Sequence, residues 1–336
     1  MKVLITGHQG YIGAHLTKLA MDAGFEVAGC DIGLFDDCEW SEVPAPTVEW
    51  KRDFRVLSVQ DLQGFDCVMH LAAISNDPMG EMDETVTYEV NREGTIDFAL
   101  RCKEAGIPRF LFSSSCSIYE KKKKLDLDET ANFNPVSAYA HSKVAVEKAL
   151  NEMASEDFSP VMLRNATAYG LSPMLRIDLV ANNLLGCALA YGDIRIMSDG
   201  SPWRPLVHCK DIANAFVALA RAPKDVVHNQ SINIGGNSEN YQVRDVADQV
   251  KRLVPKANIV YTGEVGADPR DYRVKFDRLN TLLPEFRLEY SLQSGMDELF
   301  SAYIDHGFNK SDFEGNRYVR LRALKKTLPL LKEVAQ

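Results

Sequence analysis

A tyrosine and a lysine stand four residues apart at Tyr139 and Lys143, within an apolar-periodic segment that runs over 137–150. This periodicity predicts a helix, and residues four apart on a helix share one face. An ammonium group beside a phenol favours the phenolate and lowers the pKa of the phenol below its usual value of about 10. Such a phenolate can take a proton from a sugar or alcohol hydroxyl near neutral pH. A solvent-exposed helix face can carry the same two residues. Whether the pair is catalytic therefore depends on the segments that precede it.

The amino-terminal segment has the pattern of a nucleotide-binding turn. Residues 2–6 are a short apolar run, a turn with Gly7, Gly10 and Gly13 follows, and a helical pattern runs over 14–23. Strand, turn and helix in this order bring free N–H groups and the positive end of a helix dipole to one point, which suits a pyrophosphate. The glycines permit a tight turn and close approach of the backbone. The pattern therefore predicts a dinucleotide site.

Later segments fit the same site. Further strands are predicted over 26–30, up to residue 53, over 67–73 and over 110–112, and helices over 83–105 and 176–189. Asp31 follows the second strand, about twenty residues beyond the glycines, where a carboxylate accepts the adenosine-ribose hydroxyls and repels a 2′-phosphate. This favours NAD over NADP. Asp53 could reach the adenine amine, and the small residues that end the fourth strand let a dinucleotide lie close.

Together these segments resemble the extended short-chain dehydrogenase/reductase family, specifically its NAD-dependent nucleotide-sugar epimerases and dehydratases. The matching motifs are T-G-x-x-G-Y-I-G, the strand-end Asp31, L-A-A, N-x-x-G-T, S-S-S-x-x-I-Y and Y-x-x-x-K, in family order over about residues 1–300. The resemblance implies an α/β fold: a Rossmann doubly wound parallel sheet with a smaller mixed α/β substrate domain. It also implies a triad in which Tyr139 is the base, Ser115 binds the sugar hydroxyl, and Lys143 holds the nicotinamide ribose. Asn91 would help to hold this end of the cofactor site together.

The cofactor is therefore expected to be NAD, and no metal-ligand spacing is present. The expected cofactor-binding residues are Gly7, Gln9, Gly10, Tyr11, Ile12, Asp31, Asp53, Phe54, Leu71, Ala72, Ala73, Asn91, Ser113, Tyr139 and Lys143.

The residues after Ser115 depart from the family pattern. Family 4,6-dehydratases carry Asp-Glu there as acid and base, whereas this chain has Cys116 and Ser117. That disfavours ordinary 4,6-dehydration and leaves epimerisation, in which hydride leaves and returns. Cys116 counts as a candidate catalytic residue, because a thiol beside the ring could shuttle a proton at C3 or C5 of a 4-keto sugar. The alternative is a packed small hydrophobe.

The second half carries candidate substrate contacts. Two guanidinium groups can hold a diphosphate by bidentate, charge-assisted bonds, which also explains how an acidic protein binds a dianion. Arg204 in segment 199–204 and Arg270 in segment 268–273 resemble the family's diphosphate-binding arginines. Trp203 either covers the sugar or plugs the domain junction. The expected substrate-binding residues are Ser115, Thr167 (where the family usually has Asn), Asn183, Arg204 and Arg270.

Composition limits the other possibilities. The net charge of −9 argues against general binding to nucleic acid or anionic membranes. Seven cysteines at irregular spacing predict reduced thiols in a cytoplasmic protein. The sequence contains no run of eighteen apolar residues, so we expect no membrane span. The predicted domains are 1–170, with return segments near 205–236, and 171–336. The second ends in a basic helical extension from 310, which is either a docked helix or a subunit contact. We expect a homodimer.

The sequence thus predicts an NAD-dependent nucleotide-sugar epimerase that acts through a transient 4-keto sugar, with hydride removed and returned by bound NAD. An isomerase is favoured over a lyase or an oxidoreductase. A dehydratase or 4-ketoreductase on the same scaffold is the alternative, and an NAD-sensing regulator without enzyme activity is a further one. The nucleotide base, the sugar and the altered carbon stay open.

Overall fold

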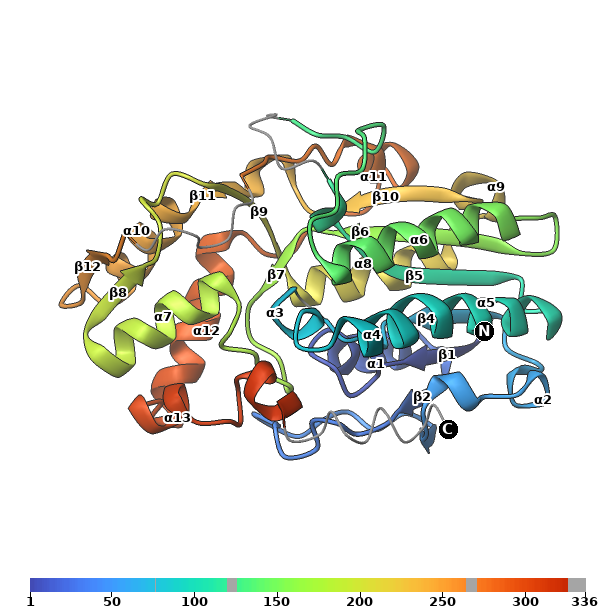
Figure 1. Ribbon diagram of the computed structural model, residues 1–336, viewed down its shortest axis with the longest axis horizontal. Coiled ribbons are helices and arrows are strands. Elements are labelled where there is room, and N and C mark those ends of the chain that lie inside the picture. Colours follow the sequence, from blue (N-terminus) through green and yellow to red (C-terminus); the bar gives the residue numbers. More distant parts are fainter. Residues whose placement is uncertain (76, 120–125, 264–270, 326–336) are drawn as a thin grey trace.

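A seven-stranded parallel sheet dominates the computed structural model, which describes residues 1–75, 77–119, 126–263 and 271–325 (Figure 1). Its strand order is β10-β6-β5-β4-β1-β2-β3. The strands are β1 (Lys2–Thr6), β2 (Glu26–Asp31), β3 (Val48–Lys51), β4 (Cys67–His70), β5 (Arg109–Ser115), β6 (Ser159–Asn165) and β10 (Gln230–Ile234). The order reverses between β1 and β4, and doubly wound sheets bind ligands outside the carboxyl ends of the strands at such a point. The predicted fold class is confirmed.

Helices cover both faces of this sheet, because successive side chains of a buried strand point to opposite sides. Val3 and Ile5 pack with α1 (Gly13–Asp22) and α8 (Cys209–Arg221). Leu4 faces the other layer. That layer contains α2 (Val59–Leu62), α4 (Glu84–Tyr88), α5 (Thr95–Glu104) and α6 (Ala138–Met153), with the short helices η1 (Phe54–Val56), α3 (Asp77–Gly80) and η3 (Cys116–Ile118) nearby.

The helix predicted over 83–105 is interrupted. Between α4 and α5 the backbone forms one wide π-helical turn, η2 (Glu89–Gly94), which holds Asn91. Wide turns of this kind are frequent at functional sites. The turn accommodates Asn91, whose side chain is buried against the segment that follows β4.

A second group of elements lies to the left in Figure 1 and has its own apolar core, which includes Leu185, Ile194, Val250 and Leu299. It contains the sheets β11-β9-β7 and β12-β8. The elements are β7 (Thr167–Tyr169), α7 (Val180–Tyr191), β8 (Asp193–Ile196), β9 (Trp203–His208), η4 (Asn237–Glu239), β11 (Asn240–Gln242), α10 (Val243–Leu253), β12 (Asn258–Tyr261), α12 (Leu292–His306) and α13 (Lys310–Glu314). Helices α9 (Lys224–Val227) and α11 (Asp277–Leu282) flank β10 and β6.

Two predicted boundaries change. The helix expected from residue 176 begins at Val180, because Leu179 has extended backbone angles at its N-cap. Arg176 therefore lies in the loop before α7. At the other end of the chain, residues 320–325 are helical and pack beside the loop that follows β2. This supports the docked helix over that range, whereas residues 326–336 lie outside the described residues.

Within the described ranges, no helix combines the length and apolarity that crossing a membrane would require. The same residues contain no group of three or more His, Cys, Asp or Glu side chains arranged to hold a metal ion.

Candidate active site

A cavity of about 730 Å³ opens at the carboxyl ends of the parallel strands and extends toward β8 and β9. It brings together residues from the glycine turn, from the ends of β2, β4 and β5, and from α6 and α7. The predicted site residues that line it are Gly7, Gln9, Gly10, Tyr11, Ile12, Asp31, Asp53, Phe54, Leu71, Ala72, Ala73, Ser113, Ser115, Tyr139, Lys143, Thr167, Asn183 and Arg204.

The glycine turn leaves no room for side chains at two positions. Gly7 has φ +76°, and a Cβ there would lie 2.7 Å from the backbone nitrogen of Ala72. A Cβ on Gly13 would lie 2.0 Å from the carbonyl oxygen of Gly7. The turn therefore packs tightly against β4 and directs the amino end of α1 into the cavity, as anion binding at a helix start requires.

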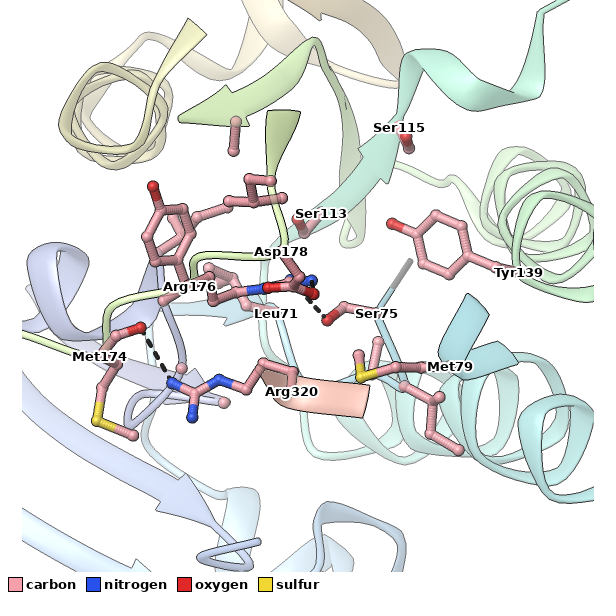
Figure 2. Close-up of a pocket in the computed structure, with 18 of the residues that line it drawn as sticks. Leu71, Ser75, Met79, Ser113, Ser115, Tyr139, Met174, Arg176, Asp178 and Arg320 are labelled. Atoms are coloured by element: carbon pink, nitrogen blue, oxygen red, sulfur yellow. Dashed lines mark hydrogen bonds and ion pairs between the residues drawn. The ribbon is translucent and has the colours of Figure 1, made fainter. Parts of the chain in front are cut away.

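Helix α6 presents Tyr139 and Lys143 to the cavity. Ser137 caps the helix by accepting a hydrogen bond from the Ala140 N–H, so Tyr139 falls in the first turn. The Lys143 Nζ lies 5.5 Å from the centre of the Tyr139 ring and donates to the Ser113 carbonyl oxygen at 2.7 Å. Burial lowers the pKa of Lys143 to about 7. Figure 2 shows the Tyr139 hydroxyl directed into the cavity, on the side of Ser113 and Ser115.

A buried ion pair anchors α6 to the sheet. Glu147, one turn beyond Lys143, pairs with Arg164 of β6 at 2.6 Å and accepts a hydrogen bond from the Ser114 hydroxyl at 2.5 Å. Arg164 also donates to the Tyr119 hydroxyl at 3.0 Å. Because both charges are buried and fully hydrogen-bonded, this ion pair holds α6 in one position against β6.

A family model described as "NAD dependent epimerase/dehydratase family" matches residues 3–235. The chain belongs to this family. It is 25% identical over 320 residues to a protein of Bacillus subtilis (strain 168) named "Uncharacterized UDP-glucose epimerase YtcB", covering 90% of this chain and 99% of that one.

Among the solved structures that resemble this chain are those of TunA and MoeE5. TunA, described as a novel NAD dependent-NDP-hexosamine 5,6-dehydratase involved in tunicamycin biosynthesis, has a TM-score of 0.81 at 22% identity, covering 90% of this chain and 98% of that one. That likeness shows the fold alone. MoeE5 in complex with UDP-glucuronic acid and NAD has a TM-score of 0.78 at 25% identity, covering 91% and 100%.

NAD, the cofactor of the epimerase/dehydratase family, fits this cavity. The glycine turn excludes side chains where a diphosphate must approach. Asp31 accepts hydrogen bonds from the Gln9 and Gly33 N–H groups at 3.2 and 3.0 Å, which fixes its carboxylate at the end of β2 with lone pairs left for ribose hydroxyls. Burial raises the pKa of Asp31, and the two N–H groups oppose that rise.

Asp53 is less available to a ligand than predicted. It lines the cavity, but Arg55 donates to its carboxylate through the backbone N–H at 2.8 Å and through the guanidinium at 2.8 Å. An adenine amine would have to share this carboxylate with Arg55, in an ion pair that is nearly buried.

Among the described residues, two predicted site residues do not line the cavity. Cys116 is 1% exposed, and its thiol donates to the Arg164 carbonyl oxygen in the core, where burial raises its pKa. The thiol is thus bonded within the core and not at the cavity, which favours the packed small hydrophobe over the predicted proton shuttle. Asn91 is also buried, but its amide bonds both the N–H and the carbonyl of Ile74, at 2.8 and 2.9 Å. It thus holds the cavity-lining segment after β4, while its part in cofactor binding stays a prediction.

Ser117, which follows Cys116, lines the cavity. The Ser115 Oγ accepts the Ser117 N–H at 3.1 Å, and this turn brings the Ser117 side chain to the cavity. Within the described part of the chain, the Ser117 hydroxyl is buried without a hydrogen-bond partner. Asn165, which also lines the cavity, donates to the Ser113 hydroxyl at 3.0 Å, while no described residue bonds its Oδ1. Both polar atoms can serve a ligand.

Sequence reasoning missed a buried ion pair in the cavity wall. The Arg176 guanidinium pairs with Asp178 at 2.7 Å and donates to the Ser75 hydroxyl at 3.1 Å, beside Leu71 (Figure 2). The spacing R-x-D is visible in the sequence, but on the helix predicted from residue 176 two residues at this spacing would not face each other.

The outer end of the cavity holds the candidate substrate contacts. Arg204 of β9 is 8% exposed, and its Nη1 donates to the Trp203 carbonyl oxygen at 2.8 Å. The Asn183 amide donates to the Ile177 carbonyl oxygen at 3.1 Å. Arg270 lies outside the described residues. The Trp203 ring is not part of the cavity wall and packs under the Arg273 guanidinium instead, which favours the junction plug.

Proposed function

We propose that this protein is an NAD-dependent nucleotide-sugar epimerase that acts through a transient 4-keto sugar. The observation that carries the proposal is the grouping of Tyr139, Lys143 and Ser115 at one point of the cavity wall. A second feature supports epimerisation over 4,6-dehydration. The two residues after Ser115 supply a thiol turned into the core and a neutral hydroxyl, rather than a carboxyl acid and base.

Each group has a distinct role in this reaction. Tyr139 takes the proton of the sugar C4 hydroxyl, and the Lys143 ammonium favours its phenolate form. Ser115 hydrogen-bonds the same hydroxyl, because its Oγ is already oriented by the Ser117 N–H. When bound, NAD accepts a hydride from C4 and returns it.

The substrate is proposed to be a UDP-sugar. Arg204 and the exposed Arg195 line the outer end of the cavity, where guanidinium groups can hold a diphosphate. The name of the Bacillus subtilis relative includes UDP-glucose, and MoeE5 is described with UDP-glucuronic acid. These names support the substrate class and leave the sugar to experiment.

A panel of UDP-, GDP-, CDP- and dTDP-sugars, read by mass spectrometry and NMR, tests this proposal. Epimerisation gives a new sugar signal at unchanged mass and consumes no added reduced cofactor. Loss of one water's mass would establish a dehydratase, and consumption of NADH in step with product would establish a 4-ketoreductase. Binding of NAD without any turnover across the panel would favour the regulator.

Replacing the proposed base gives a sharper test. Tyr139→Phe should lower kcat by a factor of about 10² or more, because it removes the proton acceptor, and should leave NAD affinity within about threefold. Tyr191→Phe is the matched control, since that hydroxyl lies at the end of α7 and bonds Glu314. Unchanged turnover in Tyr139→Phe would remove the proposed base.

The homodimer, the cytoplasmic location and the domain boundaries stay predictions. Size-exclusion chromatography with light scattering tests the first of them directly.

A further inference from the structure

Arg320 is a buried arginine in the cavity wall that neither the expected motifs nor the proposed sugar chemistry uses. It lies outside the range that the family model matches, at the start of the helical residues 320–325. Its side chain is 2% exposed and lines the cavity. The guanidinium lies over the Phe35 ring at 4.5 Å, and Nη2 donates to the Met174 carbonyl oxygen at 3.0 Å (Figure 2). Nη1 is buried and has no hydrogen-bond partner among the described residues.

This guanidinium differs from the buried guanidinium groups of Arg164 and Arg176. Arg164 is paired with Glu147, and Arg176 with Asp178. No ion pair involves Arg320 among the residues that the structure describes. The Cys38 thiol lies beside it, and the Asp178 carboxylate acts on it from a distance but is already paired with Arg176. Burial lowers the pKa of Arg320 to about 10. The Cys38 thiol and the Asp178 carboxylate oppose this shift, whereas the positive charge of Arg176 adds to it. A buried cation without a counter-charge is costly, so an anion that enters the cavity here gains an unusually strong partner.

The position of Arg320 identifies that anion. One turn further along, Ala323 packs in a cluster with Ala14, Cys38 and Met174. Ala14 belongs to the first turn of α1, directly after the glycine turn. Phe35, under the guanidinium, belongs to the loop that follows Asp31. Arg320 therefore stands between the amino end of α1 and the loop beyond the ribose-binding carboxylate, which is where the diphosphate of a dinucleotide must lie.

We propose that Arg320 binds the diphosphate of NAD and that residues 320–325 are part of the cofactor site. The glycine turn then supplies backbone N–H groups to the diphosphate, and Arg320 supplies a full charge through its Nη1. This inference goes beyond the proposed sugar reaction and does not depend on it. It also explains why a helix from the carboxyl-terminal region is docked beside the loop after β2.

The experiment compares Arg320→Gln and Arg320→Lys with Arg322→Gln. Arg322 lies two residues along the same helix and is exposed, with its guanidinium on the Glu314 and Gly315 carbonyls. After removal of bound cofactor, calorimetry measures the affinity of each protein for NAD, ADP-ribose and adenosine. Arg320→Gln should weaken NAD and ADP-ribose by about tenfold or more, because a charge-assisted bond is lost. Adenosine, which lacks the diphosphate, should change by less than about twofold. Arg320→Lys should retain part of the affinity.

The melting temperature separates binding from packing. Without NAD, Arg320→Gln should melt at or above the temperature of the wild type, because an uncompensated buried charge is removed. Its increase in melting temperature on adding NAD should be smaller than that of the wild type or Arg322→Gln. Wild-type affinity for ADP-ribose in Arg320→Gln would overturn the proposal. So would an equal loss for adenosine, which would show that Arg320 only supports the fold. Neither result would bear on the sugar reaction.

Discussion

Two consecutive residues, Cys116 and Ser117, show how one backbone turn separates a core residue from a site residue. The thiol bonds the Arg164 carbonyl oxygen in the core, whereas the Ser117 hydroxyl meets the cavity without a protein partner. A buried hydroxyl without a partner costs stability, so it is best explained by a ligand that bonds it.

Paired substitutions should separate these roles. Cys116→Ala should lower the free energy of unfolding by on the order of 1 kcal/mol while kcat/KM stays within about threefold. Ser117→Ala should lower kcat/KM by about tenfold with no loss of unfolding free energy, since an unsatisfied polar group is removed. Urea denaturation and steady-state kinetics on both variants check this. A large activity loss in Cys116→Ala alone would restore the thiol to the mechanism.

At the scale of elements, the site depends on how segments without catalytic groups are held. The π-helical turn at Asn91 ties the α4–α5 helix to Ile74, directly after the small residues that border the cofactor cavity. The amide satisfies both backbone groups of Ile74, which would otherwise be buried without partners.

Asn91→Asp keeps the acceptor for the Ile74 N–H but replaces the donor by an oxygen that faces the Ile74 carbonyl. We expect a loss of about 2 kcal/mol in unfolding free energy and a weaker affinity for NAD. Asn151→Asp, at an exposed position of α6, is the control and should change neither quantity. Unaltered NAD affinity in Asn91→Asp would show that the segment after β4 needs no such support.

Elements also explain what the sequence could predict. The glycine turn, the buried strands and α6 carry local signals, because glycine spacing, apolar runs and the N-cap Ser137 each act within a few residues. Arg176 and Arg320 carry no such signal, since only tertiary packing brings their segments to the cavity. The direction of Cys116 depended on a turn of three residues, η3, that no periodicity reveals.

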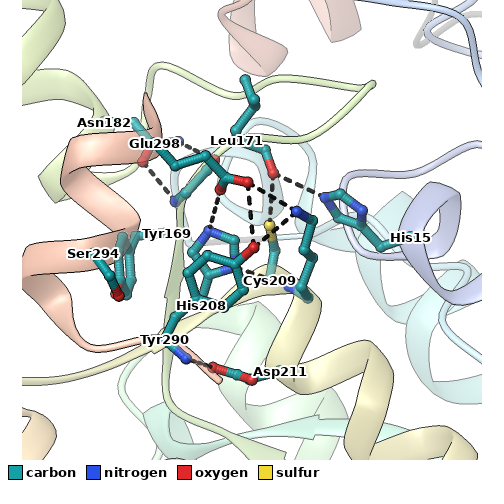
Figure 3. A network of polar contacts seen from close by, with 12 residues as sticks. His15, Tyr169, Leu171, Asn182, His208, Cys209, Asp211, Tyr290, Ser294 and Glu298 are labelled. Atoms are coloured by element: carbon teal, nitrogen blue, oxygen red, sulfur yellow. Dashed lines mark hydrogen bonds and ion pairs between the residues drawn. The ribbon is translucent and has the colours of Figure 1, made fainter. Parts of the chain in front are cut away.

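At the scale of the whole molecule, a polar network connects α1 and α8, which pack on the large sheet, to α12 of the second group of elements (Figure 3). His15 donates to the Leu171 carbonyl oxygen at 2.8 Å. Lys210 pairs with Glu298 at 2.8 Å, and the His208 ring stacks on Tyr290 with centroids 3.8 Å apart. Burial lowers the pKa of His208, that of His15 to about 4 and that of His70 to about 3.

Because of these histidines, we expect the free energy of unfolding to fall in acid. Between about pH 6.5 and 4 the unfolded chain binds protons that the native protein does not, so the free energy of unfolding falls as the pH falls. Glu298 extends the effect below that range: although burial raises its pKa, hydrogen bonds from His208 and Lys210 hold it at about 2. Its contribution is lost as the pH falls from about 4.5 toward 2.

His15→Gln should therefore reduce the loss of unfolding free energy between pH 6.5 and 4.5 by on the order of 2 kcal/mol. Urea midpoints at several pH values measure this, with the exposed His141→Gln as control. Parallel curves for wild type and His15→Gln would show that His15 is not kept neutral by the fold.

The cofactor cavity takes its wall from almost the entire described chain, from Gly7 to Leu324. During synthesis the glycine turn leaves the ribosome early, but the arginine at position 320 is added some three hundred residues later. Strand β10, which completes the sheet beside β6, also comes late. We expect nascent chains to capture NAD only after residues 320–325 have left the ribosome.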